Sequence, residues 1–189
     1  MNLIVVSVGT DHHQFDRIID WIDSWKSSEA VEFVIQRGSS KESVKWKSDS
    51  LIPHTDLLEM FAKSQVVVSH GGPSTVMDIR KSGKLPIVVP RNPEFGEHID
   101  NHQMLFAEHM KNAEIAKVAS TKEELFEYID HAIKNPDDFV ISKREGFLPG
   151  VLKFGEVLDG LLQTSTPIVP DSPEMLDESV RDSNRSEME

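Results

Sequence analysis

The chain of 189 residues contains no cysteine, which excludes disulfides, thiolate nucleophiles and zinc–thiolate sites. It also has no apolar run near the length of about 20 residues that crosses a membrane. The opening MNLIVVSVG is a short apolar run without a basic segment before it, so we expect no signal peptide. These absences lead us to expect a cytoplasmic protein.

Positive charge is scarce as well, because 20 Lys and Arg residues stand against 32 Asp and Glu residues, a formal net charge of −12. So acidic a surface disfavours nucleic acid or anionic lipid as a partner. Residues 164–189 carry seven acidic and two basic side chains among many Ser and Pro residues. We predict a disordered acidic tail there and one folded domain over residues 1–163.

Three functional motifs are also missing. No GxGxxG follows a predicted strand, which disfavours a nicotinamide oxidoreductase. No GxSxG is present, which disfavours a hydrolase with a Ser-His-Asp triad. No Asp-x-Asp pair offers an Mg²⁺ site, so we expect neither a metal nor a cofactor.

The chain does contain a repeated strand–turn–helix pattern. Short apolar runs predict buried strands at residues 3–8, 31–35, 66–68, 85–89 and 114–118. Residues 41–49 are expected to be irregular, and residues 51–53 to form a short strand or an extended turn. The predicted fold is therefore α/β, a Rossmann-like parallel sheet flanked by helices.

Helices are predicted between the strands from the spacing of apolar residues and from their end signals. Each is expected to return the chain to the amino end of the next strand. The predicted signals are Phe15 at the first helix, Asp56 with Glu59 at the second, and Ser74 or Thr75 as the cap and Gly83 as the end of the third. The polar loop up to Gln103 is expected to enter a fourth helix. Thr121 and Glu124 form the capping box of the fifth, and residues 149–162 are expected to form a last amphipathic helix.

The turn SHGGP before the third helix suits a phosphate, because two glycines let backbone N–H groups approach it and the helix N-terminus adds partial positive charge. Asp78 stands about one helical turn further on, where a carboxylate would accept from two ribose hydroxyls. The plain alternative is a tight turn with a capping serine. Gly9–Thr10 and Gly38–Ser40, after the first two strands, leave the same choice between a phosphate site and an ordinary turn.

Two further features, a pair of loop histidines and Arg91, can each be explained either by a chemical role or by a structural one. His12 and His13 beside Asp11 suggest a general base, although loop histidines are common without a role. Arg91 follows a strand at the edge where ligands bind. Its guanidinium would meet a carboxylate or phosphate there, or else form a surface salt bridge.

His98 and His102 have the i, i+4 spacing that can place two imidazoles on one helix face around a metal, with Asp100 between them. No third ligand stands out, and the HExxH arrangement is absent. We therefore predict no metal site in this segment.

Together these motifs resemble the nucleotide-sugar-binding C-terminal domain of family-28 GT-B glycosyltransferases. The stretch SHGGPSTVMDI is similar to that family's HxGxxSTxxE region, with Asp78 where the family has Glu, and DNHQ is similar to its (D/E)xxQ segment. VSVGTDHHQFDRII, QRGSS, SHGGPSTVMDI, VVPR and FGEHIDNHQ are also similar, in this order, to bacterial PssE-type subunits of exopolysaccharide synthesis. This resemblance covers residues 1 to about 160.

The resemblance implies the catalytic donor-binding half of a split, inverting enzyme whose acceptor half is a membrane-associated PssD-type chain. The pair would transfer a sugar from a UDP-sugar to a polyprenyl-diphosphate-linked glycan, and the partner would recruit this chain to the inner face of the cell membrane. Homo-oligomerisation is left open. His13 is the in-chain choice for the catalytic base. The residues expected to bind the donor are Gly9, Thr10, Arg37, Gly38, Ser39, Ile52, His70, Gly71, Gly72, Ser74, Thr75, Asp78, Arg91, His98, Asp100, Asn101, His102 and Gln103.

Three alternatives remain from the sequence. A UDP-sugar 2-epimerase shares the scaffold but needs two domains in one chain. A non-catalytic subunit would bind the donor and stabilise a glycosyltransferase partner. A nicotinamide oxidoreductase is disfavoured by the missing GxGxxG. UDP-sugar binding would separate the first two from the third, and turnover would separate a transferase from a non-catalytic subunit.

Overall fold

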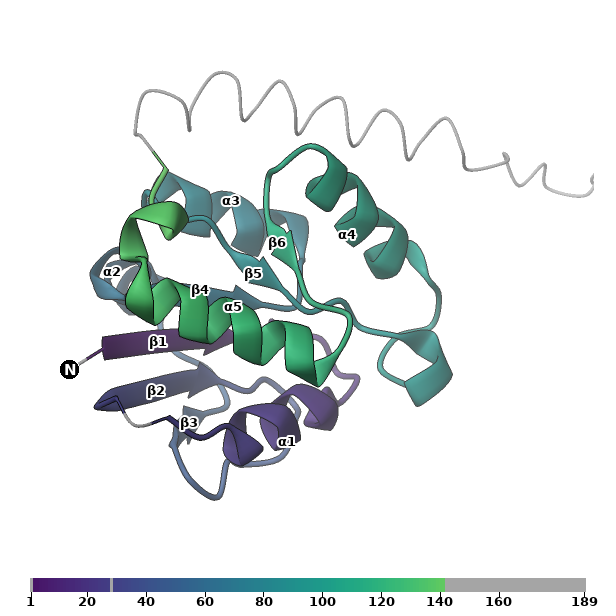
Figure 1. Cartoon of the computed structure of the whole chain (residues 1–189). Helices are drawn as coiled ribbons and strands as arrows, with labels where there is room; N and C mark the ends of the chain where they lie inside the picture. Colours follow the sequence, from purple (N-terminus) through teal and green to yellow (C-terminus); the bar gives the residue numbers. More distant parts are fainter. Residues whose placement is uncertain (1, 28, 142–189) are drawn as a thin grey trace, which may run out of the picture.

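The computed structural model describes residues 2–27 and 29–141, and its centre is a parallel sheet of six strands in the order β3-β2-β1-β4-β5-β6 (Figure 1). Every neighbouring pair in that order is parallel. The predicted Rossmann-like α/β fold is confirmed. The strands are β1 (Asn2–Ser7), β2 (Val31–Gln36), β3 (Lys47–Asp49), β4 (Val66–Ser69), β5 (Ile87–Val88) and β6 (Lys117–Val118).

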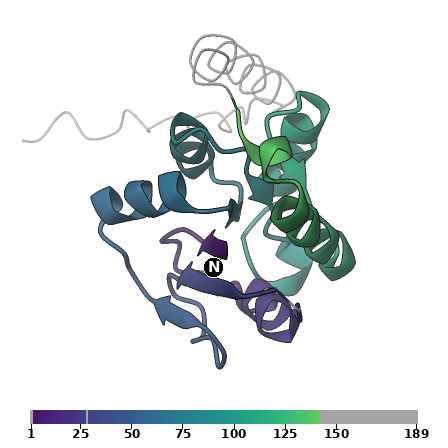
Figure 2. The ribbon, with the colours of Figure 1, turned by 60° about the vertical axis from the view of Figure 1, so that its left-hand side comes forward.

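Helices cover both faces of the sheet (Figure 2). One face packs against α1 and α5, and the other packs against α2, α3 and α4. The helices are α1 (Asp16–Ser24), α2 (His54–Lys63), α3 (Pro73–Lys81), α4 (His102–Asn112) and α5 (Lys122–Lys134), with short 3-10 helices η1 (Pro93–Phe95) and η2 (Pro136–Phe139).

The two central strands are apolar on both sides, as a sheet between two helix layers requires. In β1, Ile4 and Val6 face the α1 and α5 layer, whereas Val5 faces the α2 and α3 layer. In β4, Val66 lies on the first side and its neighbour Val67 on the second. All five side chains are fully buried, which explains why these runs show no polar alternation.

The strand order places a change of direction between β1 and β4, because β2 and β3 continue on one side of β1 while β5 and β6 continue beyond β4. In open parallel sheets, ligands bind in the crevice at the carboxyl ends of the two strands where the order reverses. The turns that begin at Val8 and His70 lie at these two ends.

Several local predictions are wrong. Residues 47–49 form β3, although 41–49 were expected to be irregular; this short polar edge strand pairs with β2 and has no apolar pattern to reveal it. Residues 51–53 have no regular secondary structure, so of the two forms expected there the short strand is wrong. Neither Ser74 nor Thr75 caps α3, since the N-cap is Gly72 and Pro73 takes the first helical position.

Other helix and strand ends were predicted with mixed success. The capping box is confirmed, because Thr121 Oγ1 accepts from the Glu124 amide at 3.2 Å and the Glu124 carboxylate accepts from the Thr121 amide at 3.3 Å. By contrast, α2 begins at His54 without a side-chain cap, and β6 is shorter than predicted.

Two predictions fall outside the described residues, namely the helix at 149–162 and the tail at 164–189. The predicted boundary between the domain and its tail lies there too. Within residues 2–27 and 29–141, no helix has the length and apolarity needed to span a membrane.

Candidate functional site

The site is organised around His70, which directly follows β4 and is only 9% exposed. Its ring lies between the backbones of two glycines. A Cβ added to Gly9 would lie 2.7 Å from His70 Cε1, and one added to Gly72 would lie 2.4 Å from His70 Nε2. Both positions therefore need glycine for close packing, and Gly9 also has a φ of +78°, which L side chains rarely adopt.

The His70 ring is neutral at physiological pH. Burial, followed by the positive charge of Arg91, lowers its pKa to about 4. Its Nδ1 lies 3.3 Å from the carbonyl oxygen of Ser7, so the neutral ring donates from Nδ1 and leaves Nε2 without a proton. His70 thus joins the ends of β1 and β4 without adding positive charge.

The N-terminus of α3 opens directly beyond this ring. Because Gly72 has no side chain and Pro73 follows it, no side-chain cap bond occupies the first N–H groups of the helix. Gly71 has a φ of +88° and donates its N–H to Ser69 Oγ at 3.0 Å, which fixes the turn. Such an uncapped N-terminus, with partly exposed Thr75 and exposed Ser74 in its first turn, is a ready site for an anion.

Asp78 lies further along α3, and its Oδ2 is 2.9 Å from Nε2 of His54 at the start of α2. The sequence did not reveal this pair, because the two residues are far apart in the chain and lie on different helices. Ile52, predicted to contact the donor, is buried beneath α2 and α3 with Leu57 and Ile79. Its amide is held by Gln36 Oε1 at 3.1 Å.

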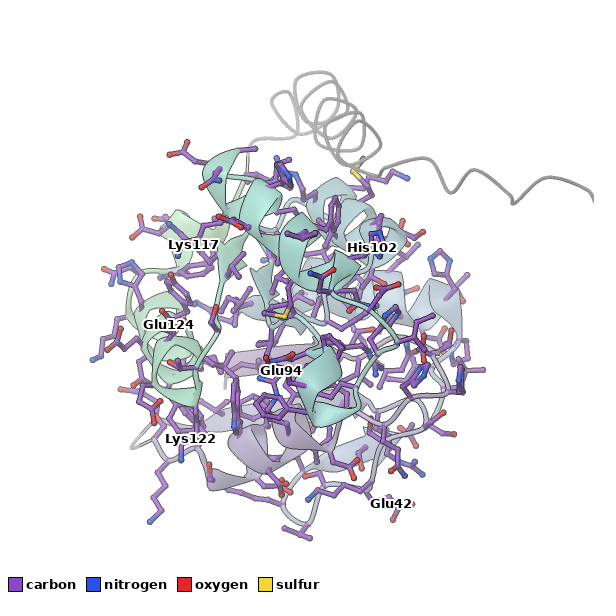
Figure 3. All side chains as sticks on the ribbon, turned by 90° about the vertical axis from the view of Figure 1, so that its right-hand side faces the viewer. Glu42, Glu94, His102, Lys117, Lys122 and Glu124 are labelled. Atoms are coloured by element: carbon purple, nitrogen blue, oxygen red, sulfur yellow. The ribbon has the colours of Figure 1, made fainter. Side chains whose placement is uncertain are left out.

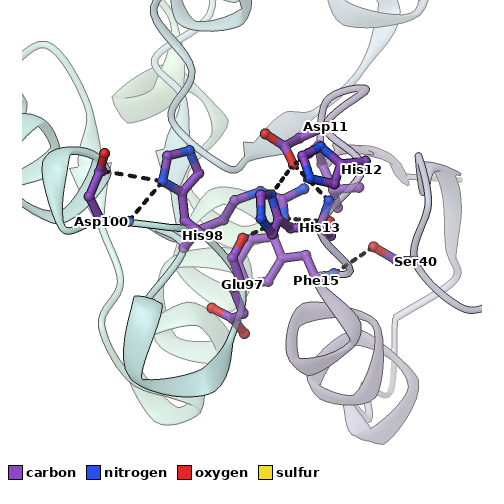
Figure 4. A network of polar contacts seen from close by, with 10 residues as sticks. Asp11, His12, His13, Phe15, Ser40, Glu97, His98 and Asp100 are labelled. Carbon is purple, nitrogen blue, oxygen red and sulfur yellow. Dashed lines mark hydrogen bonds and ion pairs between the residues drawn. The ribbon is translucent and has the colours of Figure 1, made fainter.

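The loop after β1 carries a histidine–carboxylate pair (Figure 4). Asp11 Oδ1 accepts from the backbone amide of His13 at 2.7 Å and lies 2.6 Å from His13 Nδ1. Partial burial alone would raise the pKa of Asp11, but hydrogen bonds from His13 and the charge of Arg91 outweigh it and lower that pKa to about 2. The His13 ring lies 5.7 Å, between centroids, from the ring of His98.

Arg91 is buried and 1% exposed, so the surface salt bridge considered from the sequence is wrong. Its guanidinium donates to the carbonyl oxygens of Val8 at 2.9 Å, His13 at 2.7 Å and Glu97 at 3.0 Å. Its Nε has no hydrogen-bond partner among the described residues. Arg91 therefore holds the loop after β1 against the loop after β5.

A second arginine, which no sequence motif had indicated, strengthens this connection. Arg17 of α1 donates twice to the Glu97 carboxylate, each time at 2.8 Å, and once to the Pro90 carbonyl at 2.9 Å. Glu97 also accepts from the Asn92 amide at 2.8 Å. The partners are 80 residues apart in the chain, a separation at which no local pattern links them.

Asp100 connects the two histidines of the next segment (Figure 3, where His102 is labelled). Its Oδ1 lies 2.9 Å from His102 Nδ1 and 3.3 Å from His98 Nδ1. Because α4 begins at His102 with Asn101 as its N-cap, His98 lies in the loop before it and the two rings do not share a helix face. The side-chain oxygen Oε1 of Gln103 is buried and has no hydrogen-bond partner among the described residues.

The loop after β2 packs against the loop after β1. Gly38 has a φ of +56°, and a Cβ there would lie 2.5 Å from the Gly9 carbonyl oxygen. Arg37 holds its own loop by donating to the Ser40 carbonyl at 2.8 Å, and it pairs with Glu42 at 3.1 Å. Thr10 is exposed at the rim.

A cavity of about 770 Å³ adjoins these loops on the α1 side. His13, Ser39, Phe95 and Glu97 are among its lining residues, but Asp78 and the first turn of α3 are not. The predicted donor residues therefore fall into two groups: those around the turn from His70 to Asp78, and those around the His13 and His98 loops.

With this geometry in place, the comparisons with known proteins are informative. The family model for the glycosyltransferase family 28 C-terminal domain matches residues 3–147. The chain belongs to this family. A comparison with curated protein sequences gives no match.

A solved structure with a TM-score above 0.5 shows the same fold. The calicheamicin glycosyltransferase CalG4 aligns with a TM-score of 0.52 and 13% identity over 87% of this chain and 44% of its own. MurG of Acinetobacter baumannii gives 0.49 and 14% over 86% and 49%, and SnogD from Streptomyces nogalater gives 0.48 and 17% over 86% and 43%. The family 28 domain described here thus spans less than half the length of each of these chains.

The close fit of His70 against Gly72 leads to a steric prediction. Gly72 has a φ of −59°, which alanine adopts without strain, so Gly72→Ala adds only a methyl group against the His70 ring. We expect a loss of about 1–3 kcal/mol in unfolding free energy, measured by urea denaturation. In a His70→Ala background the same substitution should cost less than about 1 kcal/mol. Equal costs in both backgrounds would contradict the contact.

The buried, neutral His70 also predicts a pH dependence. The unfolded chain binds a proton at this histidine below its ordinary pKa of 6.5, whereas the folded chain binds one only near pH 4. The contribution of His70 to stability is therefore complete above pH 6.5, is lost as the pH falls from 6.5 to 4, and amounts to about 3 kcal/mol. Urea denaturation across this range should give a steeper loss for the natural chain than for His70→Gln; parallel curves would contradict it.

Proposed function

We propose that this family 28 domain is the catalytic, donor-binding half of an inverting glycosyltransferase that uses a UDP-sugar. The observation that carries the proposal is the uncapped N-terminus of α3 at the carboxyl end of β4, with Asp78 further along the same helix. A diphosphate fits the N–H groups of this helix, and a ribose fits the carboxylate. Membership of the family supports a glycosyltransferase in general.

The diphosphate end of the donor is stabilised by dipoles. As the donor's sugar leaves, negative charge develops on the UDP oxygen, and the N–H groups of Gly72 and of the first turn of α3 stabilise it. The hydroxyls of Ser74 and Thr75 add donors at the same place. Because the His70 ring is neutral, the backbone and the helix dipole carry this task.

The sugar end is assigned to the segment from His98 to Gln103. Asp100 holds His98 and His102 in place, and the buried, unpartnered Oε1 of Gln103 has an acceptor to offer a sugar hydroxyl. Asn101 is the N-cap residue of α4 in the same segment. Polar groups of this kind, fixed by one another, suit recognition of hydroxyls.

His13 is the proposed general base. Its Nδ1 is engaged by Asp11, which leaves Nε2 to accept a proton from the attacking hydroxyl of the acceptor. The acceptor oxygen then bonds to the anomeric carbon, the bond from that carbon to the phosphate oxygen breaks, and its electron pair leaves with UDP. Attack from the opposite face inverts the anomeric centre.

The acceptor, the partner and the cellular location are part of the same proposal. We assign the acceptor to a polyprenyl-diphosphate-linked glycan of exopolysaccharide synthesis, held by a membrane-associated PssD-type chain. Support comes from the five motifs that resemble PssE-type subunits, which occur in the same order along residues 1 to about 160. The alternative left open by the sequence is a non-catalytic subunit that binds the donor and stabilises its partner.

Calorimetric titration of the purified chain with UDP tests the donor site. We expect UDP to bind, and Asp78→Ala to weaken binding by about 10- to 100-fold, because hydrogen bonds to a charged group contribute about 1.5–3 kcal/mol. Glu127→Ala is the matched control, since Glu127 is exposed on α5, which covers the opposite face of the sheet from α3.

Unchanged affinity in Asp78→Ala, or an equal loss in Glu127→Ala, would contradict the site. Turnover with a lipid-linked acceptor and the partner chain then separates the two candidate functions. His13→Ala should abolish transfer while leaving UDP affinity unchanged if the chain is catalytic. Full transfer by this variant would leave the non-catalytic alternative.

A further inference from the structure

The loop after β1, which carries the proposed base His13, also holds a cluster of side chains of the kinds that ligate metals. Within the described residues, the side chains of Asp11, His12 and His13 bring one ligand-type atom each to within 4.8 Å of the other two. The two imidazole rings lie against each other, with centroids 3.9 Å apart, next to the Asp11 carboxylate (Figure 4). Two imidazoles and one carboxylate form a ligand set that transition metals use in proteins.

The distances leave little to rearrange. His12 Nδ1 lies 3.6 Å and His13 Nδ1 lies 2.6 Å from Asp11 Oδ1. Ligands on a tetrahedral zinc ion, at 2.0–2.1 Å from the metal, stand about 3.4 Å apart, so one distance already fits and the other has to widen by less than ~1 Å. The His12 side chain is 87% exposed, so it can turn without disturbing the core.

The cluster is also accessible and held from behind. His12 and His13 line the cavity of about 770 Å³ beside α1, which gives an ion a route from solvent. The backbone carbonyl of His13 accepts from buried Arg91 at 2.7 Å, which fixes the loop that carries all three side chains. A fixed backbone reduces the entropy lost when ligands converge on an ion.

We propose that Asp11, His12 and His13 bind a divalent transition metal, with Zn²⁺ as the best match. Water completes the coordination at the open side. Mg²⁺ is a poor match because it prefers oxygen ligands and an octahedral shell. The ion is not a cofactor of the transfer, since it takes up the Asp11 and His13 side chains themselves.

The metal site has a consequence that rests on the proposed function. An ion bound to His13 Nδ1 takes the lone pair of that nitrogen, so the single proton of the neutral ring moves to Nε2 and the proposed base is lost. The turn from His70 to Asp78 has no part in this cluster. Zn²⁺ should therefore inhibit sugar transfer while UDP binding is retained.

Calorimetric titration of the tag-free full chain with Zn²⁺ alone tests the site. We expect one ion per chain, and a loss of at least about tenfold in affinity for His12→Ala, the effect of removing one ligand. His131→Ala is the matched control, because His131 Nε2 lies 2.6 Å from Asp138 Oδ2 on an exposed surface, a histidine–carboxylate pair outside this cluster. The affinity of the His131→Ala variant for Zn²⁺ should equal that of the natural chain.

Failure of Zn²⁺ to saturate a single site, or equal losses in His12→Ala and His131→Ala, would overturn the proposal. Displacement of Zn²⁺ by equimolar Mg²⁺ would also overturn it. Measuring UDP affinity in the same samples keeps the two proposals apart. Zn²⁺ binding without UDP binding would refute the proposed donor site alone, whereas UDP binding without Zn²⁺ binding would refute the metal site alone.

Discussion

The insertion of the His70 ring between Gly9 and Gly72 is the contact on which the rest of the site depends. It joins the ends of the two central strands at the place where the sheet order reverses. A larger residue at either glycine would push the turns apart, and the uncapped start of α3 would move away from the loop after β1. Burial keeps the ring neutral, so the contact requires no nearby anion.

Buried charge holds the outer loops to this centre. Arg91 is buried and Arg17 is partly buried, and taking a cation out of water is costly unless carbonyls and carboxylates surround it. Here Arg91 meets three carbonyl oxygens, and Arg17 meets the nearly buried carboxylate of Glu97. Removing one member of such a group leaves its partners unsatisfied, so the loops that carry His13 and His98 depend on all of them.

The sequence predicted the parts that local patterns determine. Doubly buried strands such as Val66–Val68, the glycine turn after them and the capping box at Thr121 each depend on neighbouring residues alone. The prediction was wrong at the start of α3. Ser74 was expected to cap this helix, but Pro73 takes the first helical position and Gly72 is the N-cap. The polar edge strand β3 had no apolar pattern to detect.

Contacts between distant segments could not be predicted from one sequence. His54 meets Asp78, Arg17 meets Glu97, and Arg91 turns inward rather than to the surface, because the fold brings separate loops to one edge of the sheet. The positions of the predicted donor residues at that edge follow from the parallel topology. Their individual partners follow only from packing.

The central claim is that UDP binds at the carboxyl ends of β1 and β4, against the first turn of α3. Amide chemical-shift mapping of the ¹⁵N-labelled chain during a UDP titration tests it most directly. If UDP binds there, the largest shifts occur at Gly71, Gly72, Ser74 and Thr75, and α5 is unaffected. Shifts confined to the cavity between α1 and η1, with none in the turn after β4, would contradict it.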